Sequence, residues 1–292
     1  MRSFMLLLCA ISMVSAGSYF NTIKLHDSVS GKGRGLIFDS SGLPRVNSQD
    51  YLHAIAEENV SGHKKWSKIG YNDAIGTTEE TMWSYSTQYS FITTAGQIQV
   101  VSSAATDTVG DVGARTVKVT YLKSDYTEGV CTLLVKARTQ VASGASHADV
   151  WRVNSFRILT SGDSCKAIGN LTLSQVTGEK VVSYIRAGKT RARNIVYTVP
   201  FGKTLYITSI SFSAVGTKYL IFTTRINYDS DSKTILQRGL FYPINEVALL
   251  NSAYTKTLLI PEKIPATVDI IVSVIAEAAG SLGTCHLRGW LE

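Results

Sequence analysis

Beyond Lys64, hydrophobic and polar positions alternate along short segments that turn residues separate. The clearest alternation spans residues 115–121, in which every second side chain is apolar. A period of two is typical of a strand with one buried face. A fuller apolar run at 130–135 is typical of a strand buried on both faces.

These patterns predict two groups of strands. The first group comprises residues 64–71, 80–86, 89–93, 97–103, 114–122, 129–137 and 149–160. The second group comprises residues 180–186, 193–199, 204–214, 218–228, 234–242, 255–260, 268–276 and 283–291. Short strands with turns at regular spacing favour sandwiches and barrels. We therefore expect an all-β chain of two tandem antiparallel β-sandwich domains, jelly-roll-like, at 61–175 and 176–292.

Three polar or proline-bearing segments are expected to separate strands. The segment 199–203 carries a proline and then a glycine two residues later, which is typical of a tight turn. The prolines of 261–265 predict a second break between strands. Residues 229–232 resemble part of a calcium loop but lack its glycine and closing glutamate, so we interpret them as a polar hairpin turn.

The N-terminal 60 residues do not follow the strand pattern. Residues 1–16 combine a cation, a short apolar run and small residues, which is typical of a secretory signal peptide cleaved after Ala16. The competing interpretation is a retained apolar arm used in assembly. Residues 17–60 are predicted to form an N-terminal arm with a short helix at 48–58, where Ser48 can act as the cap.

The net charge of +7 raises the question of an anionic partner. The densest group of cations lies in a glycine-containing turn and consists of Arg186, Lys189, Arg191 and Arg193. Two interpretations stay open for this group, a solvated loop and a contact with an anionic surface. No strand motif with base-stacking aromatics surrounds it, so no specific nucleic-acid partner is expected.

The chain offers no recognisable catalytic or metal-binding motif. Its five histidines are scattered, and the wide spacing of its four cysteines excludes a zinc ribbon or a redox pair. Adjacent Glu79 and Glu80 would point to opposite faces of a strand and do not form a glycosidase pair. We expect no enzyme activity and no cofactor. One disulfide among Cys131, Cys165 and Cys285 stays open.

A series of short segments occurs in a characteristic order along the chain, including GARTVKV at 113–119 and YTVPFGKT at 197–204. The other members are 38–46, 62–64, 68–72, 80–83, 151–153, 156–157, 260–263 and 269–270. This series resembles virion structural proteins of tailed phages, especially marine ones, and of related environmental viruses. The chain departs from that family in its signal-like N-terminus.

The resemblance implies a non-enzymatic virion structural protein: a capsid decoration, head-fibre or tail-associated component. Its expected partners are other copies of the chain, as a trimer, and the major capsid protein or another virion protein. Its expected location is the virion, and the signal-like start suggests a route through a secretory pathway. The alternative is a secreted or virion-displayed adhesin that binds a host surface glycan or receptor. A third hypothesis, a polysaccharide-degrading enzyme, has no acid pair to support it.

Overall fold

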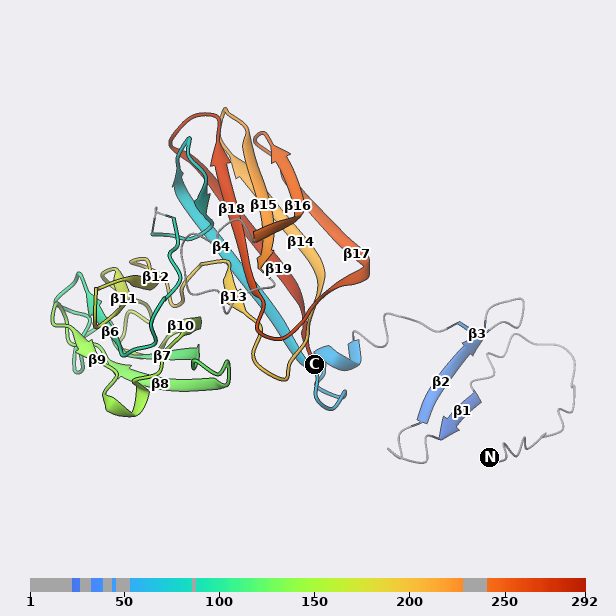
Figure 1. The fold of residues 1–292 in the computed structure, drawn as a ribbon, viewed down its shortest axis with the longest axis horizontal. Helices are drawn as coiled ribbons and strands as arrows, with labels where there is room; N and C mark the ends of the chain where they lie inside the picture. Colours follow the sequence, from blue (N-terminus) through green and yellow to red (C-terminus); the bar gives the residue numbers. More distant parts are fainter. Residues whose placement is uncertain (1–22, 27–32, 39–43, 46–52, 86–87, 228–240) are drawn as a thin grey trace, which may run out of the picture. The chain divides into compact units, whose positions relative to one another are not determined.

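A computed structural model describes residues 23–26, 33–38, 44–45, 53–85, 88–227 and 241–292 (Figure 1). Contacts divide the chain into two compact units, residues 1–59 and 60–292. In the first unit β1 (Ile23–His26), β2 (Gly33–Phe38) and β3 (Pro44–Arg45) form an antiparallel sheet, which the sequence pattern did not predict. Residues 53–56 form a helical turn. The signal-like segment 1–16 and the start of the predicted helix at 48–58 lie outside the described residues.

Two of the antiparallel sheets in the second unit contain the strands nearest its chain ends. One sheet has the order β17-β14-β19-β4 and consists of β4 (Lys64–Ile75), β14 (Leu205–Val215), β17 (Ala253–Ile264) and β19 (Ser281–Leu291). The other has the order β13-β18-β15-β16, with β5 also paired to β18, and consists of β5 (Glu80–Thr81), β13 (Val196–Thr198), β15 (Leu220–Asn227), β16 (Phe241–Leu249) and β18 (Asp269–Ala276).

Two further sheets come from the middle of the chain. The first has the order β10-β7-β8 and consists of β7 (Ala114–Leu122), β8 (Glu128–Leu134) and β10 (Arg152–Ser161). The second has the order β12-β11-β6-β9 and consists of β6 (Ile98–Ser102), β9 (Val141–Ala142), β11 (Leu171–Gln175) and β12 (Val181–Ile185). A short 3₁₀ turn, η1 (Ala145–His147), follows β9. The prediction of an all-β chain with antiparallel sheets is confirmed.

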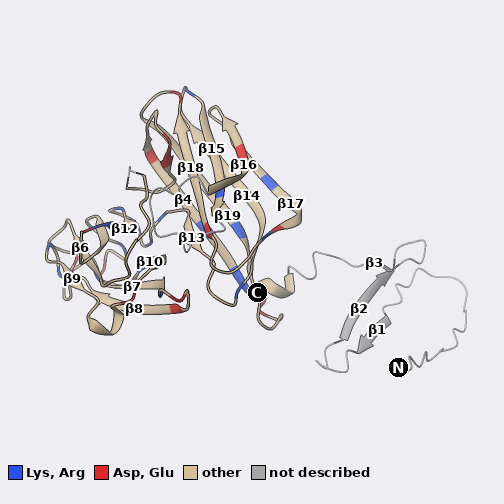
Figure 2. Ribbon diagram, viewed as in Figure 1, with Lys and Arg blue, Asp and Glu red and all other residues tan. Residues whose placement is uncertain are grey.

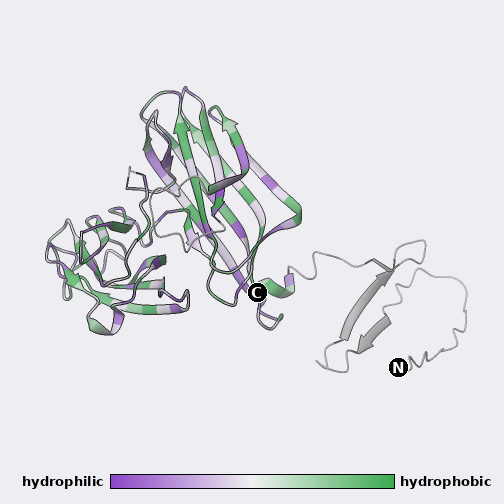
Figure 3. Ribbon diagram, in the orientation of Figure 1, coloured by the Kyte–Doolittle hydropathy of each residue, from purple (hydrophilic) through white to green (hydrophobic). Residues whose placement is uncertain are grey.

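The buried apolar side chains of the second unit form two large clusters. One cluster draws on residues 66–82 and 195–287, and its centre includes Phe212 stacked on Phe222 with ring centroids 4.9 Å apart. The other draws only on residues 92–185. Figure 3 shows hydrophobic bands recurring along the strands of these regions. We call residues 64–85 with 193–292 the main lobe, and residues 88–192 the inserted lobe.

In sequence, the inserted lobe lies between β5 and β13, two strands of the main lobe that pair with successive parts of β18. β5 pairs with Ser273 and Val274 of β18, and β13 pairs with the next part of β18, residues 269–271. Between them, the N–H of Met82 donates to the carbonyl of Val272 at 2.8 Å, and the N–H of Val272 donates to the carbonyl of Ile195 at 3.2 Å. β5 and β13 therefore lie end to end along one edge of β18, and the chain leaves and rejoins this edge on either side of the inserted lobe.

Strand pairs cross the boundary of the predicted division into 61–175 and 176–292. β11 ends at residue 175, yet it pairs antiparallel with β12 beyond that boundary. β4, near the start of the second unit, pairs with β19 at its end, from Lys64 opposite Leu291 to Ile75 opposite Ser281. Alternation predicts which side chains are buried, but it carries no information about which distant strand supplies the partner.

Several predicted strand limits also differ from the structure. β17 continues through Pro261, so the break expected there is wrong; Pro is tolerated because β17 is an edge strand. Between the pairs Ile207–Glu262 and Ser209–Thr257 the register shifts, so residues 258–261 form a bulge in β17. The strand predicted at 89–93 is absent from the described residues there, and β11 was not predicted. The turn at 199–203 is confirmed by the hydrogen bond from Lys203 N–H to Pro200 O, 3.1 Å.

The remaining local predictions concern cysteines and polar turns. Cys131 on β8 and Cys285 on β19 are buried, whereas Cys165 is exposed in a turn with φ 53°, and all three are free thiols. A disulfide among them is therefore not formed. The polar turn predicted at 229–232 lies outside the described residues.

A buried ion pair joins the two lobes. Arg152 of β10 donates through Nε and a terminal nitrogen to the two carboxylate oxygens of Asp269 on β18, both at 3.2 Å. Arg152 is 4 % exposed and Asp269 1 %. The Thr198 hydroxyl also donates to Asp269, and Arg152 donates to the carbonyls of Ile92 and Trp151. This network fixes the inserted lobe at the point where the chain rejoins the main lobe.

Candidate functional site

The basic turn predicted from the sequence follows β12 and is held at both ends. Gly188 has a φ of 76°, which favours glycine, and its N–H donates to the carbonyl of Ala167 at 2.8 Å. After the turn, the chain pairs with β10: Ile158 N–H donates to Thr190 O at 2.8 Å, and Ala192 N–H donates to Phe156 O at 2.9 Å. The cations of the turn therefore sit on backbone that the inserted lobe fixes.

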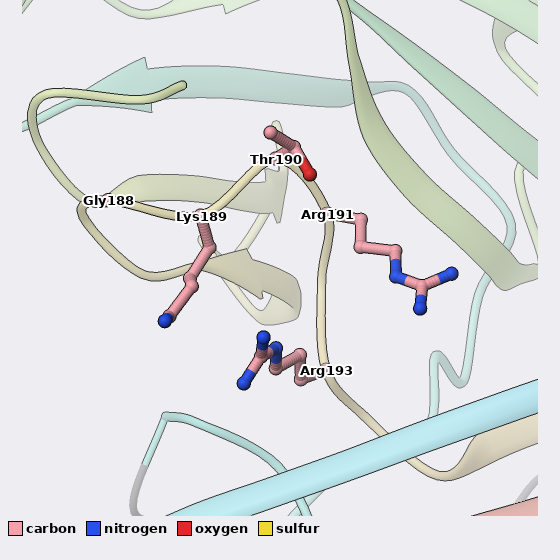
Figure 4. A pocket seen from close by; sticks show the side chains of 5 residues that line it. All are labelled: Gly188, Lys189, Thr190, Arg191 and Arg193. Atoms are coloured by element: carbon pink, nitrogen blue, oxygen red, sulfur yellow. The ribbon is translucent and has the colours of Figure 1, made fainter. Parts of the chain in front are cut away.

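An open pocket of about 250 Å³ forms beside this turn. It is lined by Gly188, Lys189, Thr190, Arg191 and Arg193. Figure 4 shows the ammonium group of Lys189 and the guanidinium group of Arg193 converging on the same space, while the guanidinium group of Arg191 points to the other side. Three of the four predicted contact residues thus line one concavity.

The fourth predicted residue, Arg186, has a different environment. Its guanidinium group forms an ion pair with Asp73 on β4 and lies over the ring of Tyr71, 6.0 Å from the centroid. The hydrogen bond to Asp73 is the main reason that the pKa of Arg186 is raised. Arg193 lies over the same ring at 5.7 Å. Tyr71 therefore orients Arg193, whereas Asp73 already neutralises Arg186.

Two further cations that the sequence pattern did not identify lie beside Arg191. Arg157 on β10 forms an antiparallel bridge with Arg191, and Lys118 on β7 lies directly opposite Arg157. The bonds flanking the bridge make Arg157 and Arg191 a non-hydrogen-bonded pair, the arrangement with the closest side chains. Arg157 and Arg191 are exposed, and Lys118 is partly exposed. The three cations form one row across the strands.

The positive charge at this site affects two groups of the main lobe. Burial, and then the charge of Arg191, lower the pKa of Lys68 on β4 to about 7; its Nζ donates to the carbonyl of Asn154 at 2.6 Å. Burial, Arg288 and Arg191 lower the pKa of His286 on β19. A lowered pKa favours the neutral form of both side chains, so Lys68 and His286 add less positive charge near Arg191.

Other chemistry-bearing residues are placed apart from this site. Glu79 is exposed and accepts hydrogen bonds from Arg225 and Ser273, whereas Glu80 is buried and accepts from Gly76 N–H at 2.7 Å. Among the described residues, no group of three His, Cys, Asp or Glu side chains could hold a metal ion. In the same residues, no helix is long and apolar enough to cross a membrane. Figure 2 shows Lys and Arg at many separate places along the ribbon.

Comparisons with known proteins add little to this geometry. No family model matches the chain, and no curated protein matches it significantly. The solved structure of infectious bursal disease virus strain Gx is 11 % identical, covering 78 % of this chain and 74 % of that one, with a TM-score of 0.17. The VP2 subviral particle of the same virus is 10 % identical, covering 83 % and 86 %, with a TM-score of 0.12. At such TM-scores the similarity carries no argument about fold or function.

Proposed function

We propose that the chain is a non-enzymatic virion structural protein whose main lobe is a jelly-roll sandwich and whose inserted lobe projects a second β module from it. The observation that carries the fold is the nesting of strand pairs. β4 pairs with β19, β5 with β18, β14 with β17 and β15 with β16. The first strand of the main lobe thus pairs with the last, the second with the last but one, and so on inward.

A jelly roll is a ribbon of four such antiparallel pairs that is rolled up so that its eight strands form two facing sheets. The contacts β14–β19 and β15–β18 are those that rolling the ribbon would create. Both resulting sheets contribute buried side chains to one cluster, as the two layers of a sandwich would. Jelly rolls are frequent in viral capsid proteins and in lectins.

The step from this fold to a virion role rests on the ordered series of phage-like segments, because a fold alone does not specify a function. Two features of the main lobe suit the role. Among the described strands, β16 and β17 lie at sheet edges, where backbone groups are available to a neighbouring chain. Leu259 and Ile260, in the bulge of β17, are 100 % and 86 % exposed. Such edges favour closed symmetric oligomers, and we propose a trimer.

Quantitative mass spectrometry of purified virus particles tests the virion role. We expect this chain in the particles at a fixed copy ratio to the major capsid protein, a ratio unchanged by repeated density-gradient purification. Absence of the chain from infectious, purified particles would refute the proposal. If the chain is instead a component of the particle, imaging of the same particles will distinguish decoration, head-fibre and tail positions.

The alternative function is a secreted or virion-displayed adhesin that binds a glycan or receptor. One observation favours it specifically: the pocket formed by Lys189, Arg191 and Arg193. The two functions are compatible, because a component of the virion surface can also bind a host glycan. A free, monomeric protein secreted by cells and missing from particles would favour the adhesin over the virion component.

A further inference from the structure

The basic pocket and the row of cations beside it meet at one residue. Arg191 belongs to both, since it lines the pocket and pairs with Arg157 across the strands. Opposed side chains on neighbouring strands have Cβ atoms roughly 4.5–5.5 Å apart, so Lys118, Arg157 and Arg191 are spaced closely. We call these three residues with Lys189 and Arg193 the basic site.

No acidic side chain among the described residues forms an ion pair with the basic site. Arg186, in contrast, is paired with Asp73. Like charges placed directly opposite on neighbouring strands destabilise a sheet. After burial, the charge of Arg191 also contributes to the lowered pKa values of Lys68 and His286. An anion bound at the site would relieve this repulsion.

The face on which the row lies indicates the kind of anion. The strand register places Ser155, Thr120 and Val130 in the neighbouring row on one side, and Thr160, Thr116 and Leu134 on the other. The opposite face is buried through Val117, Val119 and Phe156, so the hydroxyl-bearing face is the outer one. Hydroxyls and cations side by side can bind the hydroxyl and acidic groups of a sugar chain at once.

A nucleic acid fits this face less well. Single-stranded nucleic acids are held largely by bases stacked on aromatic rings. The outer positions of β7, β8 and β10 carry no aromatic side chain. Tyr71, the ring beside the pocket, is covered by Arg186 and Arg193. A flat sheet face also cannot enter the major groove of a duplex in the way a helix or a two-stranded ribbon does.

We propose that the basic site binds an acidic polysaccharide, with a sulfate or carboxylate group in the pocket of Lys189 and Arg193 and neighbouring acidic groups along the row of Arg191, Arg157 and Lys118. This inference goes beyond the structural role in the virion and does not depend on it. It would stand if the chain were absent from particles, and it could fail while the chain remained a virion component.

The test measures binding of a fluorescent heparin oligosaccharide to the full chain by anisotropy, with neutral dextran as the uncharged probe. We expect saturable heparin binding and no dextran binding. The double variant Lys189→Ala with Arg193→Ala should weaken binding by about tenfold to a hundredfold, since each of the two charge-assisted contacts accounts for roughly a factor of ten. Arg157→Ala should weaken it by a smaller factor. All three side chains are at least partly exposed, so these variants should fold normally, and circular dichroism checks this.

A charge-matched control separates a specific site from general attraction. Lys218→Ala with Lys256→Ala removes two exposed cations of the main lobe and should change affinity less than about twofold. Arg186→Ala should also have little effect, because Asp73 already pairs with Arg186. Equal losses in the pocket and control variants, or an unchanged affinity in the pocket variant, would overturn the proposal. Equally tight binding of a single-stranded oligonucleotide of matched charge to the same residues would replace the polysaccharide with a nucleic acid.

Discussion

The ion pair between Arg152 and Asp269 offers the sharpest test of how the two lobes are joined. Both side chains are almost fully buried, and the guanidinium group contacts both carboxylate oxygens. It also lies over the rings of Phe91 and Trp151, 4.8 and 4.5 Å from their centroids. Burial raises the pKa of Asp269, while Arg152 and the hydroxyl of Thr198 oppose that rise. Removal of either charge leaves the other buried without its partner.

We expect Asp269→Asn and Arg152→Met each to lower the free energy of unfolding by about 3–5 kcal/mol, the usual cost of breaking a buried ion pair. That is a large fraction of the 5–15 kcal/mol typical of a folded protein. The double variant should lose about 2–3 kcal/mol less than the sum of the two single losses, because neither buried charge remains unpaired.

Urea unfolding of the wild type, both single variants and the double variant measures these values as a double-mutant cycle. Arg186 and Asp73 provide a matched control, since they are also an arginine–aspartate pair but their side chains are 43 % and 28 % exposed. Asp73→Asn should cost no more than about 1 kcal/mol. If Asp269→Asn cost as little as Asp73→Asn, the ion pair would not join the lobes as described.

Three further predictions test other parts of the structure. The pKa of Lys68 in the folded protein is about 7, below its ordinary value of 10.5. Between these two pH values the unfolded chain therefore binds more protons than the folded protein. The free energy of unfolding then rises with pH, by up to about 1.4 kcal/mol per pH unit from this group. Lys68→Met should therefore be more stable than wild type at pH 6, and urea unfolding should show this advantage shrinking towards pH 10. Gly289→Ala should lower the free energy of unfolding by more than about 2 kcal/mol in the same assay, because the added Cβ would lie 1.8 Å from the carbonyl oxygen of Tyr206. Gly96→Ala is the control: its Cβ would have no atom closer than 3.6 Å, and the loss should be under about 1 kcal/mol. Asp107→Asn should lower the thermal midpoint measured by calorimetry and cost about 3 kcal/mol, since the buried carboxylate accepts three backbone N–H groups and the hydroxyl of Ser102.

Local strands could be predicted from the sequence where one face is buried and the other exposed. β7 occupies the predicted residues 114–122, because residues 116–121 alternate between partly exposed and buried side chains. β11 was missed: Leu171 and Leu173 face the core, but the buried Ser174 and Gln175 end the apolar alternation. The break predicted at Pro261 is wrong because an edge strand does not need a hydrogen bond from every residue.

The basic site could be predicted only in part, for a related reason. Lys189, Arg191 and Arg193 are close in the sequence and were identified as a group. Lys118 and Arg157 come from other strands and join them only through the register of β7, β10 and the turn after β12. Register between distant strands depends on tertiary packing, and a single sequence does not encode it in any local pattern.

The inserted lobe could not be predicted for the same reason: β4 and β19 pair with each other but are far apart in the sequence, at the start and the end of the second unit. Ser67 of β4 lies directly opposite Arg288 of β19, and both side chains are exposed. Opposed Cα atoms on antiparallel strands are about 4.5–5.5 Å apart, within the range that a disulfide bridges. In two tandem domains divided after residue 175, these residues would belong to separate domains.

Disulfide trapping of this pair is the most direct test of the nested arrangement. In a Cys165→Ser background, Ser67→Cys with Arg288→Cys should form an intramolecular disulfide under mild oxidation, seen as faster migration on a non-reducing gel and as a cross-linked peptide by mass spectrometry. Ser67→Cys with Lys218→Cys, which are not paired, should not cross-link. Failure of the first pair to cross-link in folded protein would contradict the pairing of the first and last strands of the main lobe, and with it the proposed jelly roll.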